Sequence, residues 1–294
     1  MGDKDNDYLY RFVFEEFGVR GEFVRLAASW QAVRCKHDYP SLVAAPLGES
    51  LAAVSLLSAT IKFKGSLVMQ VQGEGLVNSL VVQATDSGTV RGMASFGMPR
   101  EGGAETPDPD SVLGHARLVL TAESPDGRRY QGIVPVEGGG VAGAVEHYFS
   151  QSEQLPTRLW LGADENVACG LFLQRLPGGE SDAEDWNRVT MLADTIKREE
   201  LLSLDVEELL HRLFHEESVR LYEPQPLAFR CGCSRERVAQ ALVGMGEGEV
   251  AQILDEMGTI EVNCEFCNAS YRFDTVDAAA LFLPGSGDAP DRVQ

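Results

Sequence analysis

The sequence predicts an α+β protein with a mixed α/β N-terminal domain (residues 1–178), a helical linker (179–230) and a small cysteine-rich C-terminal domain (231–294). Three observations predict this organisation. The first part alternates apolar and polar residues between turn sequences, the second combines an acidic composition with an apolar helical stripe, and the third holds two pairs of cysteines. A chain of 294 residues is long enough for one large domain and a smaller one.

The first part is expected to consist mainly of strands joined by hairpin turns. Met69 and Val71 alternate with glutamines, as residues of a half-buried strand do. The sequences Asp-Ser-Gly at 86–88 and Ser-Pro-Asp-Gly at 124–127 are typical turns, because Pro presets φ and Gly tolerates a positive φ. The expected hairpins join 80–85 to 89–95 and 118–122 to 130–134, and the expected helices cover 51–59 and 143–150.

The second part is predicted to be an amphipathic linker. It follows a boundary at Pro177, Gly178 and Gly179, because Pro and Gly in succession interrupt both helix and strand. Residues 181–230 carry twelve acidic and six basic side chains. Asp205 is a suitable N-cap for a helix whose apolar residues recur at helical spacing. This stripe consists of Val206, Leu209, Leu210, Leu213 and Phe214. Its apolar face must pack against another surface, from which it can also be released.

The third part contains a C-x-C pair, Cys231 and Cys233, and a C-x-x-C pair, Cys264 and Cys267. Pairs spaced by one or two residues let a tight turn direct two sulfur atoms at one ion, and four thiolates complete a tetrahedral zinc site. The sequence therefore predicts a zinc-binding domain with these four cysteines as the ligands of one Zn²⁺.

The thirty residues between the two pairs fit two short helices and the start of a hairpin. Ser234 is expected to cap the first helix and Gly258 to end the second. Their inner faces would carry Val238, Ala241 and Leu242, and Val250, Ile253, Leu254 and Met257, respectively. Ile260 and Val262 then alternate into a strand, with Tyr271 and Phe273 on its return partner, so that the C-x-x-C lies at the hairpin turn.

So small a domain has little core, and metal binding would supply much of its folding free energy. Two interpretations of the site stay open on spacing alone. It is a purely structural zinc site, or it is a redox switch in which oxidation of the closely spaced thiols removes the ligands. Arg230 and Arg235 flank the first pair and would favour its thiolate form in the absence of metal.

The formal charge of −20 and the pI near 4.6 argue against binding of nucleic acid or of anionic membranes. The N-terminus lacks the pattern of a signal peptide, and the apolar stretch at 51–59 is too short to cross a bilayer. A cytoplasmic location is therefore expected, where thiols stay reduced and paired cysteines indicate metal or redox chemistry.

Three segments of the chain resemble a known family. The first is CGCSRER at 231–237 with VNCEFCN at 262–268 and YRF at 271–273, the second is EHYFSQSEQLPT at 146–157, and the third is VMQVQG at 68–73. Together they resemble the 33 kDa chaperonin family of redox-regulated holdases. The order of the motifs, the chain length and the acidic linker agree, so the resemblance covers essentially the whole chain.

This resemblance implies an ATP-independent cytoplasmic chaperone and not an enzyme. It implies that the reduced, zinc-bound form is folded and largely inactive. Oxidation is then expected to form Cys231–Cys233 and Cys264–Cys267 disulfides, release zinc and unfold the C-terminal domain and the linker. The implied partners are unfolded or partly folded client proteins and, in the oxidised form, a second copy of the chain.

Two other functions share some of these features. A zinc-ribbon nucleic-acid-binding protein would use the same ligands, although the acidic charge disfavours it. A thiol oxidoreductase would need a C-x-x-C at a helix N-terminus, whereas here it follows a strand-like segment. Cys35 and Cys169 lie outside the cluster and are expected to be ordinary thiols, and His211 and His215 are expected on a solvated helix face.

Overall fold

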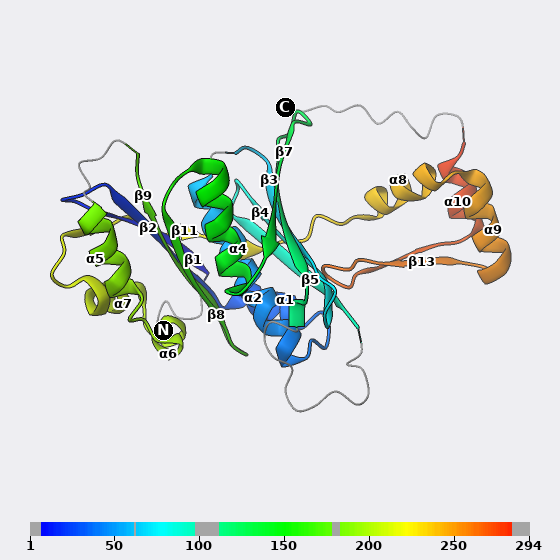
Figure 1. The fold of residues 1–294 in the computed structure, drawn as a ribbon. Coiled ribbons are helices and arrows are strands. Elements are labelled where there is room, and N and C mark those ends of the chain that lie inside the picture. The colour runs from blue at the N-terminus through cyan, green and yellow to red at the C-terminus, as the bar shows by residue number, and fades with distance from the viewer. Residues whose placement is uncertain (1–6, 62, 98–111, 178–182, 284–294) are drawn as a thin grey trace. The chain divides into compact units, whose positions relative to one another are not determined.

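The computed structural model describes residues 7–61, 63–97, 112–177 and 183–283, which form two compact units (Figure 1). The first unit ends at Arg230 and the second begins at Cys231. The mixed α+β fold class predicted from the sequence is confirmed. Each unit is described by itself below.

One sheet of the first unit, here called sheet A, has the strand order β10-β1-β2-β9-β8 with antiparallel neighbours. A further short strand, β11, pairs with β1 beside β10. The strands are β1 (Tyr8–Phe14), β2 (Val19–Leu26), β8 (Thr157–Ala163), β9 (Ala168–Arg175), β10 (Val219–Leu221) and β11 (Gln225–Pro226). Strand β8 therefore forms one edge of sheet A.

The second sheet, sheet B, has the order β12-β5-β4-β3-β6-β7. Its strands are β3 (Ser66–Gln72), β4 (Val77–Thr85), β5 (Thr89–Phe96), β6 (Ala116–Glu123), β7 (Arg129–Val136) and β12 (Ala228–Phe229). Both predicted hairpins are confirmed, since β4 pairs with β5 and β6 with β7. Gly88 and Gly127 adopt the positive φ that their turns require, 78° and 81°.

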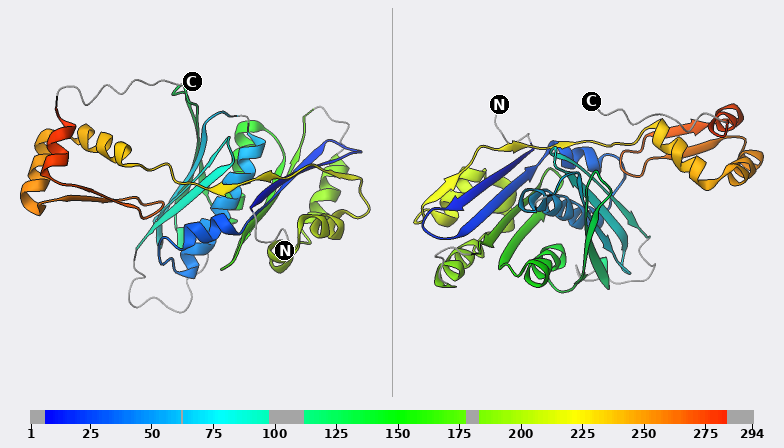
Figure 2. Two further views of the ribbon diagram at one scale, coloured as in Figure 1. Left: turned by 180° about the vertical axis from the view of Figure 1, so that it is seen from behind. Right: turned by 90° about the horizontal axis from the view of Figure 1, so that it is seen from above.

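Helix α2 (Ser41–Thr60) is the central core helix of this unit. It contacts strands of both sheets and lies between them (Figure 2). The expected helix at 51–59 was too short, because the observed helix begins directly after Pro40 and continues through Pro46. By length and composition alone α2 could cross a membrane, but 67% of its most apolar window is buried inside the protein. Its apolar sequence is therefore explained by burial on all sides.

Two further helices of this unit are α1 (Ala28–Arg34) and α4 (Gly140–Tyr148). Helix α4 contacts α2, β7 and β8, so it shares the layer between the sheets. A short π-helical segment, Phe149–Glu153, continues α4, and the helix expected at 143–150 corresponds to these two pieces.

The linker helices are α5 (Ala183–Ala193), α6 (Arg198–Ser203) and α7 (Val206–Phe214). They lie on the face of sheet A opposite α2 and α4 (Figure 1). The predicted apolar stripe of α7 is confirmed, since all five of its residues are buried in the cluster that this face forms. Asp205 caps α7 by accepting the N–H of Glu208 at 2.9 Å. Sheet A is thus covered on both faces.

The second unit consists of two helices, a hairpin and a final helix. These are α8 (Arg235–Met245), α9 (Glu247–Met257), β13 (Ile260–Asn263), β14 (Ser270–Phe273) and α10 (Thr275–Leu281). The predicted cap at Ser234 and the predicted stop at Gly258, with φ of 74°, are confirmed. Its buried core consists of Leu242, Val250, Leu254, Ile260, Phe273 and Ala278.

Two predicted core positions of this unit are wrong. Ala241 is exposed, and Ala239 packs against the core in its place. Met257 is 74% exposed because α9 ends at this residue, beyond the part of the helix that the core covers. Helix α10 was not expected from the sequence, although Asp274 and Asp277 form a reciprocal capping box at its start.

A buried carboxyl group lies within sheet A. Glu22, on β2, is 2% exposed, and its Oε2 atom has no hydrogen-bond partner among the described residues. Its Oε1 atom lies 3.9 Å from Arg20 Nε. Burial raises the pKa of Glu22 to about 7, although the positive charges of Arg20 and Arg11 oppose the shift.

Replacing Glu22 by Gln is predicted to stabilise the chain at neutral pH. The folded chain binds this proton more tightly than the unfolded chain, so the free energy of unfolding should fall as pH rises from about 4.5 to about 7. At about 1.4 kcal/mol per pKa unit, the loss approaches about 3 kcal/mol. Urea titrations across this range should show a flatter pH dependence for Glu22→Gln.

The control is Glu15→Gln. Glu15 directly follows β1, and its more exposed carboxylate pairs with Arg220. This variant should keep the native pH dependence. If the free energy of unfolding of Glu22→Gln depended on pH as steeply as that of the native chain, the destabilising effect of the buried Glu22 charge would be refuted.

Candidate functional site

The structure brings the four predicted cysteines of the second unit together. Their sulfur atoms all lie within 4.8 Å of one another. Two of the contacts join the two motifs, with 3.6 Å between the sulfur atoms of Cys231 and Cys264 and 3.3 Å between those of Cys233 and Cys267. Residues more than thirty positions apart in the sequence therefore form one compact cluster.

The C-x-C segment is held by the first turn of α8. Ser234 accepts the N–H of Arg237, and the Arg237 guanidinium reaches back to donate to the Gly232 carbonyl at 2.6 Å. A Cβ at position 232 would lie 2.9 Å from Arg237 Nη1, so glycine suits this close approach. The turn therefore fixes the backbone between the two sulfur atoms.

The C-x-x-C segment forms the tight turn between β13 and β14, as predicted. Cys264 donates its N–H to Ala269 O at 2.9 Å, and Asn268 donates to Cys264 O at 2.7 Å. Asn268 has a φ of 58°, a left-handed conformation that asparagine tolerates. Backbone N–H groups of Phe266 and Cys267 point at the Cys264 sulfur, which suits a thiolate.

The thiols differ in their tendency to ionise. Burial disfavours the Cys231 thiolate, but hydrogen bonds from the Cys233 N–H and from the neighbouring thiols outweigh it and lower the pKa to about 7. Burial, together with the nearby sulfur atoms, raises the pKa of Cys267 to about 12. Burial also raises the pKa of Cys264. Of these three thiols Cys231 ionises most readily, and a bound cation would favour the thiolate forms of Cys264 and Cys267.

The donor set fits a tetrahedral thiolate-binding metal ion. With Zn–S bonds of about 2.3 Å, a tetrahedral zinc site has S···S edges of about 3.8 Å, comparable to the separations of 3.6 and 3.3 Å between the two motifs. Tyr271 adds an outer contact, because its hydroxyl donates to Cys233 Sγ at 3.1 Å. This hydroxyl partner of the cluster was not expected from the sequence.

Arg235 does not flank the sulfur atoms as the sequence suggested. Its guanidinium lies 4.2 Å from the centre of the Phe273 ring, donates to Arg272 O and pairs with Asp277 at 2.8 Å. Arg237, two residues further on, is the arginine that contacts the C-x-C backbone. The difference arises because Arg235 opens α8 on the side of the hairpin core.

The two remaining cysteines belong to the first unit. Cys35 is exposed at the end of α1. Cys169 is fully buried in the cluster between sheet A and the linker helices, and burial raises its pKa to about 12. Arg25 Nη1 lies 3.7 Å from Cys169 Sγ and donates to Leu202 O of α6 at 2.8 Å. Cys169 therefore becomes accessible only if the linker helices move.

The interface beneath the linker is rich in aromatic residues. Phe214 of α7 packs edge-to-face on Phe14 at 5.0 Å and lies 6.5 Å from Phe12. The Phe12 ring covers Gly21, where a Cβ would come within 2.1 Å of it. Phe23, Leu171 and Leu173 continue this apolar face. Removing the linker would therefore expose a contiguous apolar surface on sheet A.

These features define an α+β protein with a two-sheet unit and a separate four-cysteine unit that can hold a metal ion. A family model described as Hsp33 protein matches residues 7–274. The 33 kDa chaperonin of Nitrosococcus oceani is 52% identical over 282 residues, covering 96% of each chain. That of Pseudomonas paraeruginosa is 46% identical over 294 residues, covering 97% of each chain. The chain therefore belongs to the Hsp33, or 33 kDa chaperonin, family of chaperones, as the resemblance implied.

A solved structure supports the fold independently. The crystal structure of the 33 kDa chaperonin of Thermotoga maritima matches with a TM-score of 0.82 at 23% identity, covering 94% of this chain and 97% of that one. At this identity the match establishes the fold.

Replacing Cys267 by Ser is predicted to weaken zinc binding by more than about 100-fold, because a direct ligand should matter more than the outer partners whose loss costs about 10–100-fold. Competition with a metallochromic chelator measures the affinity. Cys35→Ser, which removes a thiol of the first unit, is the matched control and should bind as the native chain does. Unchanged affinity in Cys267→Ser would refute the ligand assignment.

Replacing Tyr271 by Phe tests the hydroxyl contact to Cys233. The ring is retained while the hydrogen bond to sulfur is lost, so zinc affinity should fall by up to about 10–100-fold. Tyr222→Phe, at a largely exposed tyrosine of the first unit, is the control. Equal zinc affinities of the two variants in the same chelator competition would contradict a role for the Tyr271 hydroxyl.

Proposed function

We propose that this chain is a redox-regulated, ATP-independent holdase that protects unfolding proteins in the cytoplasm during oxidative stress. In this proposal residues 1–178 hold clients, 179–230 form the releasable linker and 231–294 sense the oxidant. The observation that carries it is the apolar stripe of α7, which packs on an aromatic face of sheet A. Once uncovered, this face would be an exposed apolar surface able to bind unfolded proteins.

The reduced form would hold Zn²⁺ through Cys231, Cys233, Cys264 and Cys267. When bound, the ion would supply a cross-link between the C-x-C segment and the hairpin turn. The second unit has a small buried core, so this cross-link would account for much of its folding free energy.

Oxidation would convert these thiols to Cys231–Cys233 and Cys264–Cys267 disulfides. Each disulfide forms as two thiols lose two protons and two electrons, which reduce hypochlorous acid to chloride and water or hydrogen peroxide to water. In the folded unit the sulfur atoms of the crossed partners also lie close, 3.6 and 3.3 Å apart. Pairing within each motif is favoured once the unit loosens, because neighbours in the sequence stay close at the smallest loop-closure cost.

Loosening of the second unit would reach the linker through the chain itself. Only Arg230 separates β12 from Cys231, and β10, β11 and β12 are strands of only two or three residues. Such short strands provide few hydrogen bonds to hold the segment that leads back to α7. The acidic side chains of the linker would keep the opened form soluble, and we expect the oxidised chain to form a homodimer.

The two alternative functions have less support. A thiol oxidoreductase needs an exposed low-pKa thiolate at a helix N-terminus, whereas this C-x-x-C lies in a hairpin turn and the pKa values of both its thiols are raised. The relatives of this chain are named chaperonins, a name for proteins that assist folding. A zinc ribbon that binds nucleic acid would have to overcome a net charge of −20.

An oxidant titration of the zinc-loaded protein tests the proposal. Zinc release, disulfide mapping by mass spectrometry, alkylation of Cys169 and suppression of client aggregation are measured on the same samples. All four changes should follow the oxidant dose together, and light scattering should show dimers in the oxidised samples. Cys35→Ser should behave as the native chain.

Suppression of aggregation while zinc stayed bound would contradict the proposed order of events. Crossed disulfides between the motifs would refute the proposed pairing. Turnover of disulfide substrates without zinc loss would favour the oxidoreductase, and a salt-sensitive affinity for RNA would favour the nucleic-acid-binding protein.

A further inference from the structure

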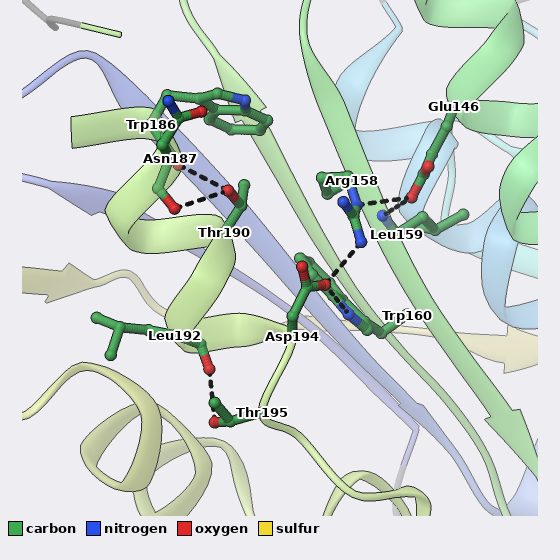
Figure 3. Close-up of polar contacts among 10 residues, drawn as sticks. All are labelled: Glu146, Arg158, Leu159, Trp160, Trp186, Asn187, Thr190, Leu192, Asp194 and Thr195. Carbon is green, nitrogen blue, oxygen red and sulfur yellow. Dashed lines mark hydrogen bonds and ion pairs between the residues drawn. The ribbon is translucent and has the colours of Figure 1, made fainter. Parts of the chain in front are cut away.

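A polar network ties the edge of sheet A to helices on both of its faces (Figure 3). Strand β8 is an edge strand, so alternate N–H groups along it lack a neighbouring strand. Glu146 of α4 accepts one of them, the N–H of Leu159, at 2.7 Å. The same carboxylate oxygen lies 3.4 Å from Nε of Arg158. Glu146 thus fixes both the edge strand and the arginine side chain.

Arg158 continues the network to the linker. Its Nη2 atom donates to Asp194 Oδ1 at 2.6 Å, and Asp194 is the residue directly after α5. The same oxygen accepts the indole N–H of Trp160 at 3.2 Å, and the Arg158 guanidinium lies 5.5 Å from the Trp160 ring centre. One carboxylate oxygen of the linker therefore receives two donors from the edge strand (Figure 3).

Hydrogen bonds at the end of α5 hold the backbone around Asp194. Thr190 donates its hydroxyl to Trp186 O and Asn187 O within the helix, and Thr195 donates to Leu192 O at 2.7 Å. The Asp194 N–H donates to Thr190 O at 2.8 Å. These bonds fix the backbone on both sides of Asp194, so its carboxylate needs little reordering to meet Arg158.

This network is one of several polar anchors of the linker, since Arg25 also donates to Leu202 O at 2.8 Å and Arg198 of α6 donates to Ala163 O and lies 3.6 Å from Glu49. The apolar stripe of α7 packs on an apolar sheet face, and apolar contact of this kind is largely non-directional. Arg158 instead makes a directional bond, donating from Nη2 to Asp194, while its Nε has no hydrogen-bond partner among the described residues and makes only an ionic contact with Glu146. The network therefore anchors the end of α5 at the edge strand of sheet A.

We propose that Glu146, Arg158 and Trp160 form a polar clasp on Asp194 that keeps the linker closed and sets how readily it opens. The role of opening in client binding rests on the function proposed above, but the clasp itself concerns opening alone. Opening frees Asp194 to water, whereas Arg158 keeps its partner Glu146, so the clasp can reform without rearranging the edge strand.

The test measures opening through Cys169, which lies beneath the linker helices. In the reduced, zinc-loaded full-length protein, the rate of Cys169 alkylation by iodoacetamide reports transient opening and is read by peptide mass spectrometry. Asp194→Ala removes both clasp bonds. Because Arg158 and Asp194 are each about two-fifths exposed, we expect a modest effect, roughly a three- to tenfold faster reaction. Asp194→Asn, which keeps an acceptor for Trp160, should have a smaller effect.

Asp185→Asn is the matched control. It removes a carboxylate charge from α5, near the end of the helix opposite to Asp194, where Asp185 lies 3.5 Å from Arg188 of the same helix. Its rate should equal that of the native chain. Trp160→Phe keeps the ring and loses the N–H donor, so its rate should lie between those of the native chain and Asp194→Ala.

If Asp194→Ala reacted no faster than Asp185→Asn, the clasp would be refuted whatever the function of the chain. If Asp194→Ala reacted faster and also suppressed client aggregation without oxidant, both the clasp and the proposed function would be supported. If it reacted faster without protecting clients, the clasp would stand and the proposed client surface would fail.

Discussion

The packing of α7 against the outer face of sheet A is the interaction on which the proposed function depends. Helices pack on both faces of sheet A, and those on the inner face are far more enclosed than those on the outer face. On the inner face, α2 is enclosed by both sheets and approaches β8 so closely that a Cβ at Gly48 would lie 2.5 Å from Ala163 Cβ. That cover cannot leave without dissolving the core. The linker helices on the outer face cover one sheet only.

The strength of the outer cover is a balance of opposing terms. Each Leu or Phe of the α7 stripe gains about 1.5–3 kcal/mol by burial. Ordering the backbone of the nine residues of α7 costs about 1–2 kcal/mol each, a sum comparable to that gain. A short, charged linker is therefore held by a small net free energy. Losing one anchor, whether the fold of the cysteine unit or a polar contact at the edge of the sheet, can then shift it toward the open form.

Much of the second unit could be predicted from the sequence, because its signals are local. The C-x-C and C-x-x-C spacing, the Ser234 cap and the Gly258 stop each depend on a few neighbouring residues, and the structure has them where expected. The α7 stripe was predictable for the same reason. Ala241 and Met257 were misplaced because helical spacing alone does not say where a small core ends.

The features that were missed depend on residues far apart in the chain. Nothing in the sequence says which face of which sheet receives the linker, or that β11 and β12 return to different sheets. Arg158 looks like an ordinary charged strand residue until β8 is known to be an edge with Glu146 on one side and Asp194 on the other. Tyr271 was assigned to a strand, but its hydroxyl contact with Cys233 depends on how the hairpin meets the C-x-C segment.

The two units are linked in this account by the free energy of folding. Metal binding would stabilise a unit with a small core, and the chain that leaves this unit runs back to the linker through very short strands. In the proposed function the four thiols would therefore control an apolar surface to which they contribute no atoms. That arrangement explains why an acidic protein can carry a large apolar face and keep it covered in the reduced state.

Hydrogen–deuterium exchange of the α7 amides, Val206–Phe214, tests this central claim most directly. The zinc-bound and the oxidised proteins are compared, with strands β3 and β4 of sheet B as the internal reference. We expect oxidation to remove the protection of the α7 amides from exchange, while the amides of β3 and β4 stay protected. If α7 remained protected in oxidised protein that holds a client, release of the linker would not be the means by which this chain exposes its binding surface.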